Sequence, residues 1–240
     1  DTNGHDFTFS NTINGTGNFT KIGAGTLTLS AGNVFWNYNG TTTVNAGTLN
    51  ITNFSGNFGS NLNDNASVVL GNASGTYSGL ISGNGSLSIP LRSQSLLVTG
   101  AENFTGNMTI SGGLLTFSGD TSQLHANITI SSNVFLNFVQ SINTSFPGNI
   151  SGAGTLFVNG TANLTLSGNL DSITMINLHS GTLIITGNTA NLQSGSVYDN
   201  STLVFNQATD SSFGMGIQGN GSLTHAGPGT LTLSRYLAYT

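Results

Sequence analysis

The sequence predicts an all-β fold, a right-handed parallel β-helix (solenoid) of about ten coils, and three observations favour it. Short hydrophobic runs alternate with polar residues at period two, which is typical of strands. Turns rich in Gly, Asn and Ser separate these runs, and 34 of the 240 residues are Gly. The pattern also returns at a nearly constant spacing, which is typical of proteins whose repeats stack on one another.

The expected strands are runs of three or four residues rich in Leu, Ile, Val and Thr. In chain order they are 26–29, 48–51, 67–70, 86–89, 114–117, 127–130, 164–166, 183–185 and 203–205. No segment of ten residues has the i, i+3, i+4 spacing of an amphipathic helix, and Gly and Asn would weaken one. Disorder is the alternative that the Gly, Ser and Asn content suggests. The 36% hydrophobic residues and their alternation argue against it.

An internal repeat with a period of about 68 residues organises the chain, and a fixed period of this kind is typical of stacked-repeat folds. An Ile-x-Gly-x-Gly pattern begins at Ile13, with Gly15 and Gly17, and returns at Ile81, Ile150 and Ile217. A second marker agrees, since a glycine precedes a strand at Gly47, Gly113 and Gly181. The hexapeptide at 25–30 reappears unchanged at 229–234. We therefore predict a single β-helix domain over 1–240, with units 13–80, 81–149 and 150–216 and partial units 1–12 and 217–240.

Each unit holds three strand groups, so we expect one coil for every 22 to 23 residues, with coils stacked at roughly 4.8 Å. The hydrophobic residues would point inward, and six phenylalanines are expected in the core: Phe7, Phe9, Phe135, Phe138, Phe157 and Phe205. A flat β-sandwich is the structural alternative. It would need hairpin turns, and no unit shows the Asn-Gly hairpin pattern consistently.

The composition excludes several classes of protein. There are 3 Lys and Arg and 8 Asp and Glu, so the basic clusters that bind phosphate are missing and no nucleic-acid partner is expected. There is no Cys, which excludes disulfides and thiolate metal sites. No run approaches the roughly 20 apolar residues of a membrane-spanning helix. The first residues do not resemble a signal peptide, so we expect a mature or trimmed chain.

No set of residues predicts catalysis, a cofactor or a metal ion, so we expect a protein that is not an enzyme. Asp64 and Asp199 occupy similar repeat positions, but six coils would separate them by about 29 Å, whereas a glycosidase pair lies about 5 to 9.5 Å apart. The remaining polar candidates are dispersed along the chain: Lys21, Arg92, Arg235, Asp120, Asp171, Asp210, His5, His125, His179 and His225.

Asn-x-Ser/Thr triplets are the most frequent motif. Chance pairing of 32 Asn with 63 Ser and Thr would give about eight of them, and the chain has about twice that number. Dense N-glycosylation is one interpretation, because glycans would hydrate a rod that has few charges. Asn turns beside Thr strands are the other. The candidates are Asn14, Asn18, Asn39, Asn50, Asn53, Asn65, Asn72, Asn84, Asn103, Asn107, Asn127, Asn143, Asn149, Asn159, Asn163, Asn200 and Asn220.

One aromatic cluster falls outside the strand pattern. Trp36 and Tyr38 are candidates for stacking on a glycan ring, and packing within a loop is the alternative. Threonine rows at 26–28, 41–43 and 230–232 raise ice binding as a remote alternative, although they recur only once per unit.

Residues 13–51 resemble the passenger-associated repeat of bacterial autotransporters. The matching elements are Gly-Thr-Leu-Thr-Leu-Ser at 25–30, Tyr38 with Gly40, Thr-Thr-Val at 42–44 and Gly-Thr-Leu at 47–49. The resemblance implies a secreted, extracellular or cell-surface β-helical stem that is often adhesive.

We therefore expect a structural segment of a glycosylated fibre or stalk that stacks end to end, either on copies of itself or on further coils. Its partners would include covalent glycans. The alternative is an adhesin that binds surface glycans or host proteins.

Overall fold

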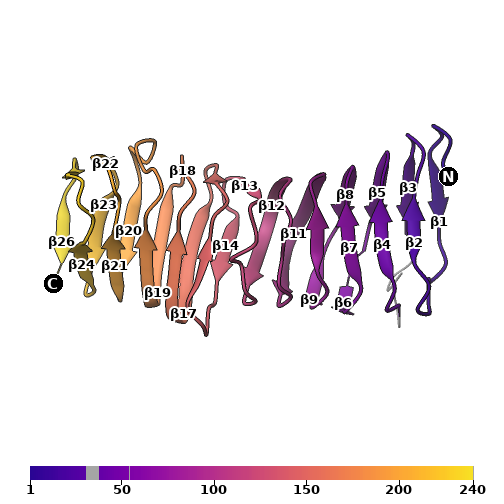
Figure 1. Cartoon of the computed structure of the whole chain (residues 1–240), viewed down its shortest axis with the longest axis horizontal. Helices are drawn as coiled ribbons and strands as arrows, with labels where there is room; N and C mark the ends of the chain where they lie inside the picture. Colours follow the sequence, from indigo (N-terminus) through magenta and orange to yellow (C-terminus); the bar gives the residue numbers. More distant parts are fainter. Residues whose placement is uncertain (31–37, 54, 240) are drawn as a thin grey trace.

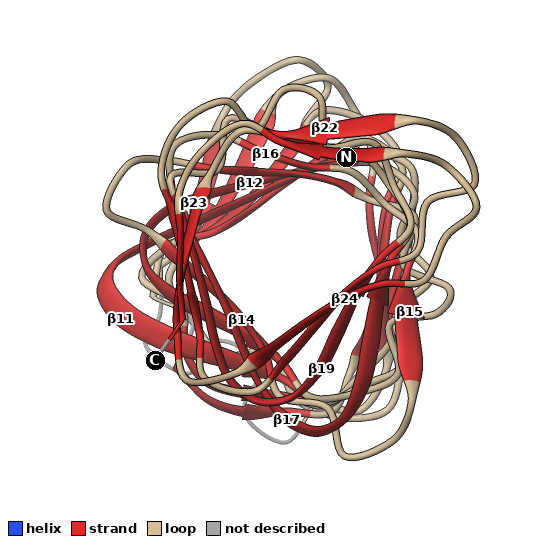
Figure 2. Ribbon diagram, turned by 90° about the vertical axis from the view of Figure 1, so that its left-hand side faces the viewer, coloured by secondary structure: helices blue, strands red, loops and turns tan. Residues whose placement is uncertain are grey.

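The computed structural model describes residues 1–30, 38–53 and 55–239, and it is a parallel β-solenoid of about 11 turns (Figure 1). The described residues contain 26 strands and no helix. The coils stack along one axis, so the two termini lie at opposite ends of the rod (Figure 1). Viewed along that axis, each coil traces a closed, roughly three-sided outline (Figure 2).

Each coil supplies one stretch of chain to each of three sides, which we call A, B and C in chain order. Side A holds β1 (Phe7–Phe9), β3 (Thr26–Leu29), β5 (Thr48–Ile51), β8 (Ser67–Leu70), β13 (Asn127–Ile130), β16 (Ile150–Ser151), β18 (Leu170–Asp171), β22 (Ser211–Phe213) and β25 (Leu231–Leu233). Side B holds β6 (Ser55–Phe58), β9 (Ser74–Tyr77), β14 (Phe135–Phe138), β20 (Ser196–Asp199), β23 (Gly216–Gly219) and β26 (Leu237–Tyr239).

Side C completes the coil. It holds β2 (Phe19–Lys21), β4 (Thr41–Val44), β7 (Asn61–Asp64), β10 (Ile81–Gly83), β15 (Thr144–Phe146), β21 (Thr202–Phe205) and β24 (Ser222–His225). Four long strands bend around a corner and so belong to two sides. From A to B these are β11 (Ser86–Val98) and β12 (Asn107–Phe117), and from B to C they are β17 (Thr155–Leu166) and β19 (Met175–Ile185). All nine strands expected from the sequence are present.

Every strand pairing in the described residues is parallel, and it joins residues 19 to 23 positions apart. Successive side chains along a strand alternate between the core and the surface. Inward residues therefore stack on inward residues of the next coil, as in the column Leu49, Val68, Leu87, Met108 and Ile128 on side A. All five side chains are buried. Burying such a side chain contributes about 1.5–3 kcal/mol, so these columns stabilise the stack.

The pairing register corrects the prediction that each repeat unit contains three whole coils. Gly47, Gly113 and Gly181 all adopt left-handed φ angles, of 67°, 68° and 78°. However, Gly47 precedes a strand on side A, Gly113 one on side B and Gly181 one on side C. Each step from one of these glycines to the next therefore equals three coils plus one side, and the predicted unit does not contain a whole number of coils. The sequence predicts about 22 to 23 residues per coil. Only a few pairings, such as that of Phe19 with Thr42, join residues so far apart, and the other coils are shorter.

Three such steps return to the same side. The repeated hexapeptide illustrates this, because residues 26–29 form β3 and residues 231–233 form β25, both on side A. Its two copies thus occupy equivalent positions near opposite ends of the rod.

The expected phenylalanine core is correct only in part. Phe138 and Phe205 are fully buried, and Phe9 packs against the core. Phe7 lies at the open N-terminal end and is 58% exposed. Phe135 and Phe157 point out of the rod, because each lies one position before an inward residue of its strand. The prediction of a core position was therefore wrong for Phe135 and Phe157, and also for the exposed Phe7.

Candidate functional site

The seventeen candidate glycosylation asparagines all have access to solvent. Thirteen are exposed, and the half-buried ones are Asn50, Asn72, Asn159 and Asn163. None belongs to the buried core.

Many of these asparagines also join neighbouring coils through their side chains. Along one edge of side A, Asn127 Nδ2 donates to Asn107 Oδ1 (3.3 Å) and Asn149 Nδ2 donates to Asn127 Oδ1 (2.8 Å). Asn149 Oδ1 accepts in turn from the backbone N–H of Asn169 (2.8 Å). An amide can both donate and accept, so a stacked row of Asn satisfies itself. The asparagines therefore have a structural role whether or not they carry glycans.

Of the two aromatic residues expected to stack on a glycan, only Tyr38 lies in the part of the chain that the structure describes. Trp36 lies outside the residues that the structure describes. Tyr38 is only 4% exposed, and its hydroxyl donates to the Thr41 carbonyl (3.1 Å). Because its ring is part of the core, its faces are closed to a sugar.

Among the described residues, the buried Lys, Asp and Glu side chains are Lys21, Asp64, Glu102 and Asp199, and they act as internal hydrogen-bonding groups. Lys21 Nζ donates to three backbone carbonyls, among them Ala46 O (3.0 Å), and burial lowers its pKa. Asp199 Oδ2 accepts from the Tyr239 hydroxyl (2.8 Å). Asp64 lies on side C and Asp199 on side B, so the structure does not bring these two carboxylates onto one face.

Burial is the main cause of the pKa shifts of the two remaining acids, Asp64 and Glu102. Asp64 Oδ1 accepts from Ala66 N–H (3.0 Å), and burial raises the pKa of Asp64 to about 6. Glu102 is 1% exposed; Oε2 accepts from Ile81 N–H (2.6 Å), and burial raises its pKa to about 8. Asp64 Oδ2 and Glu102 Oε1 have no hydrogen-bond partner among the described residues. Both acids lie inside the coil, where a polymeric substrate has no access.

The sequence reasoning missed a second aromatic feature, which lies on the outer surface of side B. Leu114, Phe135, Asn137, Phe157 and Asn159 line a groove of about 250 Å³, which we call the aromatic groove. The residues come from three successive coils, in β12, β14 and β17. One signal could have identified it: polar Asn137 two positions after Phe135 indicates that Phe135 faces outward as well.

The rings form a short stack on this surface. The Phe135 and Phe157 centroids are 5.7 Å apart with planes tilted by 59°. Phe157 and His179 are 5.9 Å apart and nearly parallel, at 5°. Asn159 Nδ2 donates to Asn137 Oδ1 (2.8 Å), so the amides form a row beside the rings.

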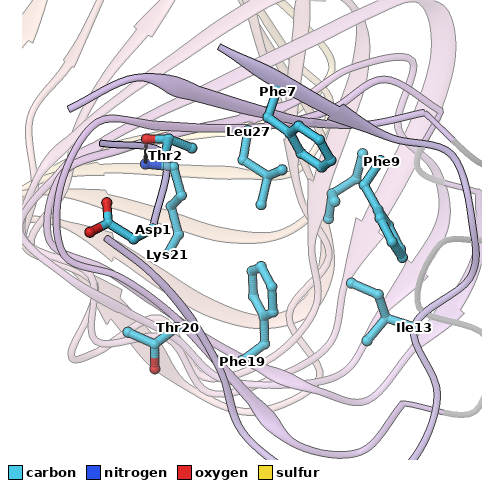
Figure 3. A pocket seen from close by; sticks show the side chains of 10 residues that line it. Asp1, Thr2, Phe7, Phe9, Ile13, Phe19, Thr20, Lys21 and Leu27 are labelled. Atoms are coloured by element: carbon cyan, nitrogen blue, oxygen red, sulfur yellow. Dashed lines mark hydrogen bonds between the residues drawn. The ribbon is translucent and has the colours of Figure 1, made fainter. Parts of the chain in front are cut away.

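The N-terminal end of the rod is open and apolar. A cavity of about 440 Å³ is lined by Phe7, Phe9, Ile13, Phe19 and Leu27, together with neighbouring residues. Figure 3 shows these side chains around the cavity, with Lys21 at one edge. The cavity is the end of the hydrophobic core, and the free edges of β1 and β2 surround it.

Metal binding and membrane spanning can be judged for the described residues. No group of three or more His, Cys, Asp or Glu is arranged to hold a metal ion. Within the same residues, no helix has the length and apolar character needed to span a bilayer.

The comparisons with known proteins gave one match. The family model of the passenger-associated transport repeat matches residues 19–51. This segment includes β2, β3, β4 and β5, and it coincides with the segment whose motifs resemble that repeat. Neither the curated proteins nor the solved structures gave a match. The resemblance is thereby confirmed, and the chain is a β-solenoid segment that carries a passenger-associated transport repeat of the autotransporter type.

Proposed function

We propose that the chain is a non-enzymatic segment of a secreted or cell-surface passenger and that it acts as a rigid rod that displays other parts of that passenger. The observation that carries the proposal is the parallel stack of coils over the described residues. Each coil bonds to the next through its backbone, so the rod resists bending without needing a specific ligand. We also propose the right-handed coil expected from the sequence.

Export can be tested by grafting. Residues 1–240 would replace the stem of an autotransporter whose secretion is well characterised, with an epitope placed before residue 1. We expect the epitope on intact cells to be accessible to antibody and to added protease. A fusion that carries the same residues in scrambled order is the control. Retention of the epitope inside the cell would contradict the proposal.

We propose that the rods carry N-linked glycans. The support is that none of the seventeen triplets has a buried asparagine, while only 11 of 240 residues are charged. Glycans would hydrate the flat faces and oppose lateral association, as charged residues do in other sheets. Intact-mass measurement of native material tests this, and a mass equal to that of the bare chain would exclude it.

We propose end-to-end stacking of rods. The last coil carries β25, whose Leu231 and Leu233 repeat the residues Leu27 and Leu29 of β3. In the structure β3 places these leucines opposite Phe7 and Phe9 of β1. The β25 strand of a second copy would present the same leucines to the free edge of β1. The contact is heterologous and leads to open filaments.

A charge at the open end tests the stacking. We expect the unchanged chain to form linear oligomers at high concentration, which light scattering and electron microscopy would detect. Phe7→Glu should abolish these oligomers. Phe135→Glu is a matched control, because it adds the same charge at an exposed phenylalanine in the middle of the rod. A monodisperse monomer of the unchanged chain would argue against stacking.

An adhesin is the second candidate function. The aromatic groove favours it, because exposed Phe135 and half-buried Phe157 form an apolar patch on the outer surface of the rod. Ice binding has no comparable support, because the threonine rows are broken: Thr28 is followed by Asn50 in the next coil, and Thr26 is followed by Thr48 and then by Ser67.

A further inference from the structure

We propose that the aromatic groove binds the sugar rings of a neutral glycan that is carried by another molecule. The groove consists of Leu114, Phe135, Asn137, Phe157 and Asn159. The proposal goes beyond a mechanical rod, and it does not depend on export or on end-to-end stacking.

The rings supply the stacking surface. Phe135 is 39% exposed, although burial of a Phe is strongly favourable, so the fold keeps an apolar ring at the surface. An aromatic face carries negative charge density. The C–H bonds on one face of a sugar ring are weakly positive, so the two faces attract while water is released. His179 packs parallel to Phe157 and holds that ring in position.

The amides supply the polar contacts. Asn159 donates to Asn137 (2.8 Å), and Asn137 Nδ2 lies 3.5 Å from Thr116 Oγ1. Each amide has two donor and two acceptor positions, so these bonds orient the row and leave capacity for a ligand. Sugar hydroxyls donate and accept in the same way, so an Asn row beside an aromatic ring matches a sugar edge.

The charge and size of the groove select among ligand classes. None of its five residues is charged, so it offers no positive charge to a phosphate or a carboxylate, and a neutral glycan is favoured over an acidic one. Its volume of about 250 Å³ lies below the roughly 300–1,000 Å³ of pockets for larger organic ligands. A stable protein partner would need about 800 Å² on each side. One or two sugar rings fit these limits better.

The chain itself is a second source of the same chemistry. Asn159 begins the triplet Asn159-Gly160-Thr161, so a glycan attached there would emerge beside Phe157. Thr161→Ala removes the triplet and keeps the Asn159 amide. This variant separates a glycan from another molecule from the chain's own glycan.

The test uses the whole chain from a host that lacks N-glycosylation. The probes are the neutral trisaccharides cellotriose, chitotriose and mannotriose, with trigalacturonate as the acidic probe. Saturation-transfer NMR should show contact between the ring C–H protons of at least one neutral probe and the protein. Phe157→Ala and Phe135→Ala should each weaken its affinity, measured by titration calorimetry, by tenfold or more.

Two matched variants locate the binding. Tyr236→Ala removes a 53% exposed aromatic ring near the C-terminal end and should leave the affinity unchanged. Phe157→Tyr keeps a ring and should retain binding within about threefold. Circular dichroism of each variant checks that the fold is kept. Binding of none of the neutral probes, tighter binding of trigalacturonate, or an equal loss in Tyr236→Ala would each overturn the proposal.

A last comparison distinguishes the two glycan sources. In material from a glycosylating host, the unchanged chain and Thr161→Ala should bind the probe equally. If only Thr161→Ala binds, the groove is occupied by the glycan on Asn159, and the claim that it serves a glycan from another molecule is wrong.

Discussion

Glu102 shows how the protonation of a single residue affects the stability of this fold. Its carboxyl group lies in the core and its pKa is raised to about 8, against 4.5 for a free side chain. A raised pKa means that the folded state holds the proton more tightly than the unfolded state does. The contribution of protonated Glu102 to the free energy of unfolding is therefore fully present below about pH 4.5, and it is lost as the pH rises to about 8.

We predict that the thermal midpoint of the chain falls by several degrees between pH 4.5 and 8. Glu102→Gln keeps an acceptor for Ile81 N–H and has no proton to lose, so its midpoint should vary much less above pH 6. Below pH 6 it should still vary, because Asp64 titrates with a pKa of about 6 in the folded state. Differential scanning calorimetry at several pH values checks this. Parallel profiles for both proteins would contradict the assignment to Glu102.

Single residues were also where the sequence was hardest to interpret. The segment Phe-Leu-Asn-Phe at 135–138 has an apolar residue at three of four positions, so a hydrophobic count cannot decide which face is inside. The register of the strand decides it, because a shift of one residue exchanges the two faces. Leu136 and Phe138 fill the core, and the aromatic groove that results from Phe135 was not predicted.

At the scale of the element, the corners between strands accept fewer residue types than the strands themselves do. Glycines at equivalent corners lie directly above one another, as Gly148, Gly168 and Gly187 do. A Cβ added at Gly168 would clash with the Gly148 carbonyl oxygen of the adjacent coil. Backbone cannot yield as a flexible side chain can, so these glycines allow coils to approach to strand spacing.

We predict that Gly168→Ala destabilises the protein by about 2–3 kcal/mol, as overpacking does elsewhere. Gly59→Ala is the matched control. Its nearest neighbour would be Ser78 Oγ at 3.7 Å, which is an ordinary contact, and we expect a change within about 0.5 kcal/mol. Urea unfolding followed by circular dichroism measures both. Equal effects would show that the corner stacking does not limit the fold.

Strands were predictable where their inward positions carry Leu, Ile or Val. Those that were missed include β6, with the sequence Ser-Gly-Asn-Phe, and β9, with Ser-Gly-Thr-Tyr. Each has only one large inward residue, and neighbouring coils rather than intrinsic preference hold it extended. Tertiary pairing of this kind cannot be read from a window of four residues.

At the scale of the whole molecule, each coil contacts only its neighbours, so stability should vary along the rod. The central coils pack on both sides, while β1 and β26 each pack on one side only. In a linear array, opening begins where a neighbour is missing.

We predict that backbone amides in β13, β14, β17 and β19 exchange with solvent at least a hundredfold more slowly than those in β1 and β26. Hydrogen exchange followed by mass spectrometry gives the protection of each segment. Uniform protection along the chain would instead indicate a single cooperative unit. Repeating the measurement under conditions that favour end-to-end stacking should raise the protection of both terminal strands.

The spacing of the repeat markers has a consequence for how the rod meets its surroundings. The equivalents Ile81, Ile150 and Ile217 lie on sides C, A and B in turn. A sequence feature that recurs at this spacing is therefore rotated by a third of the circumference at each copy, while it advances along the axis of the rod. The copies follow a helical path around the rod. Each of the three sides thus presents one copy to an approaching partner.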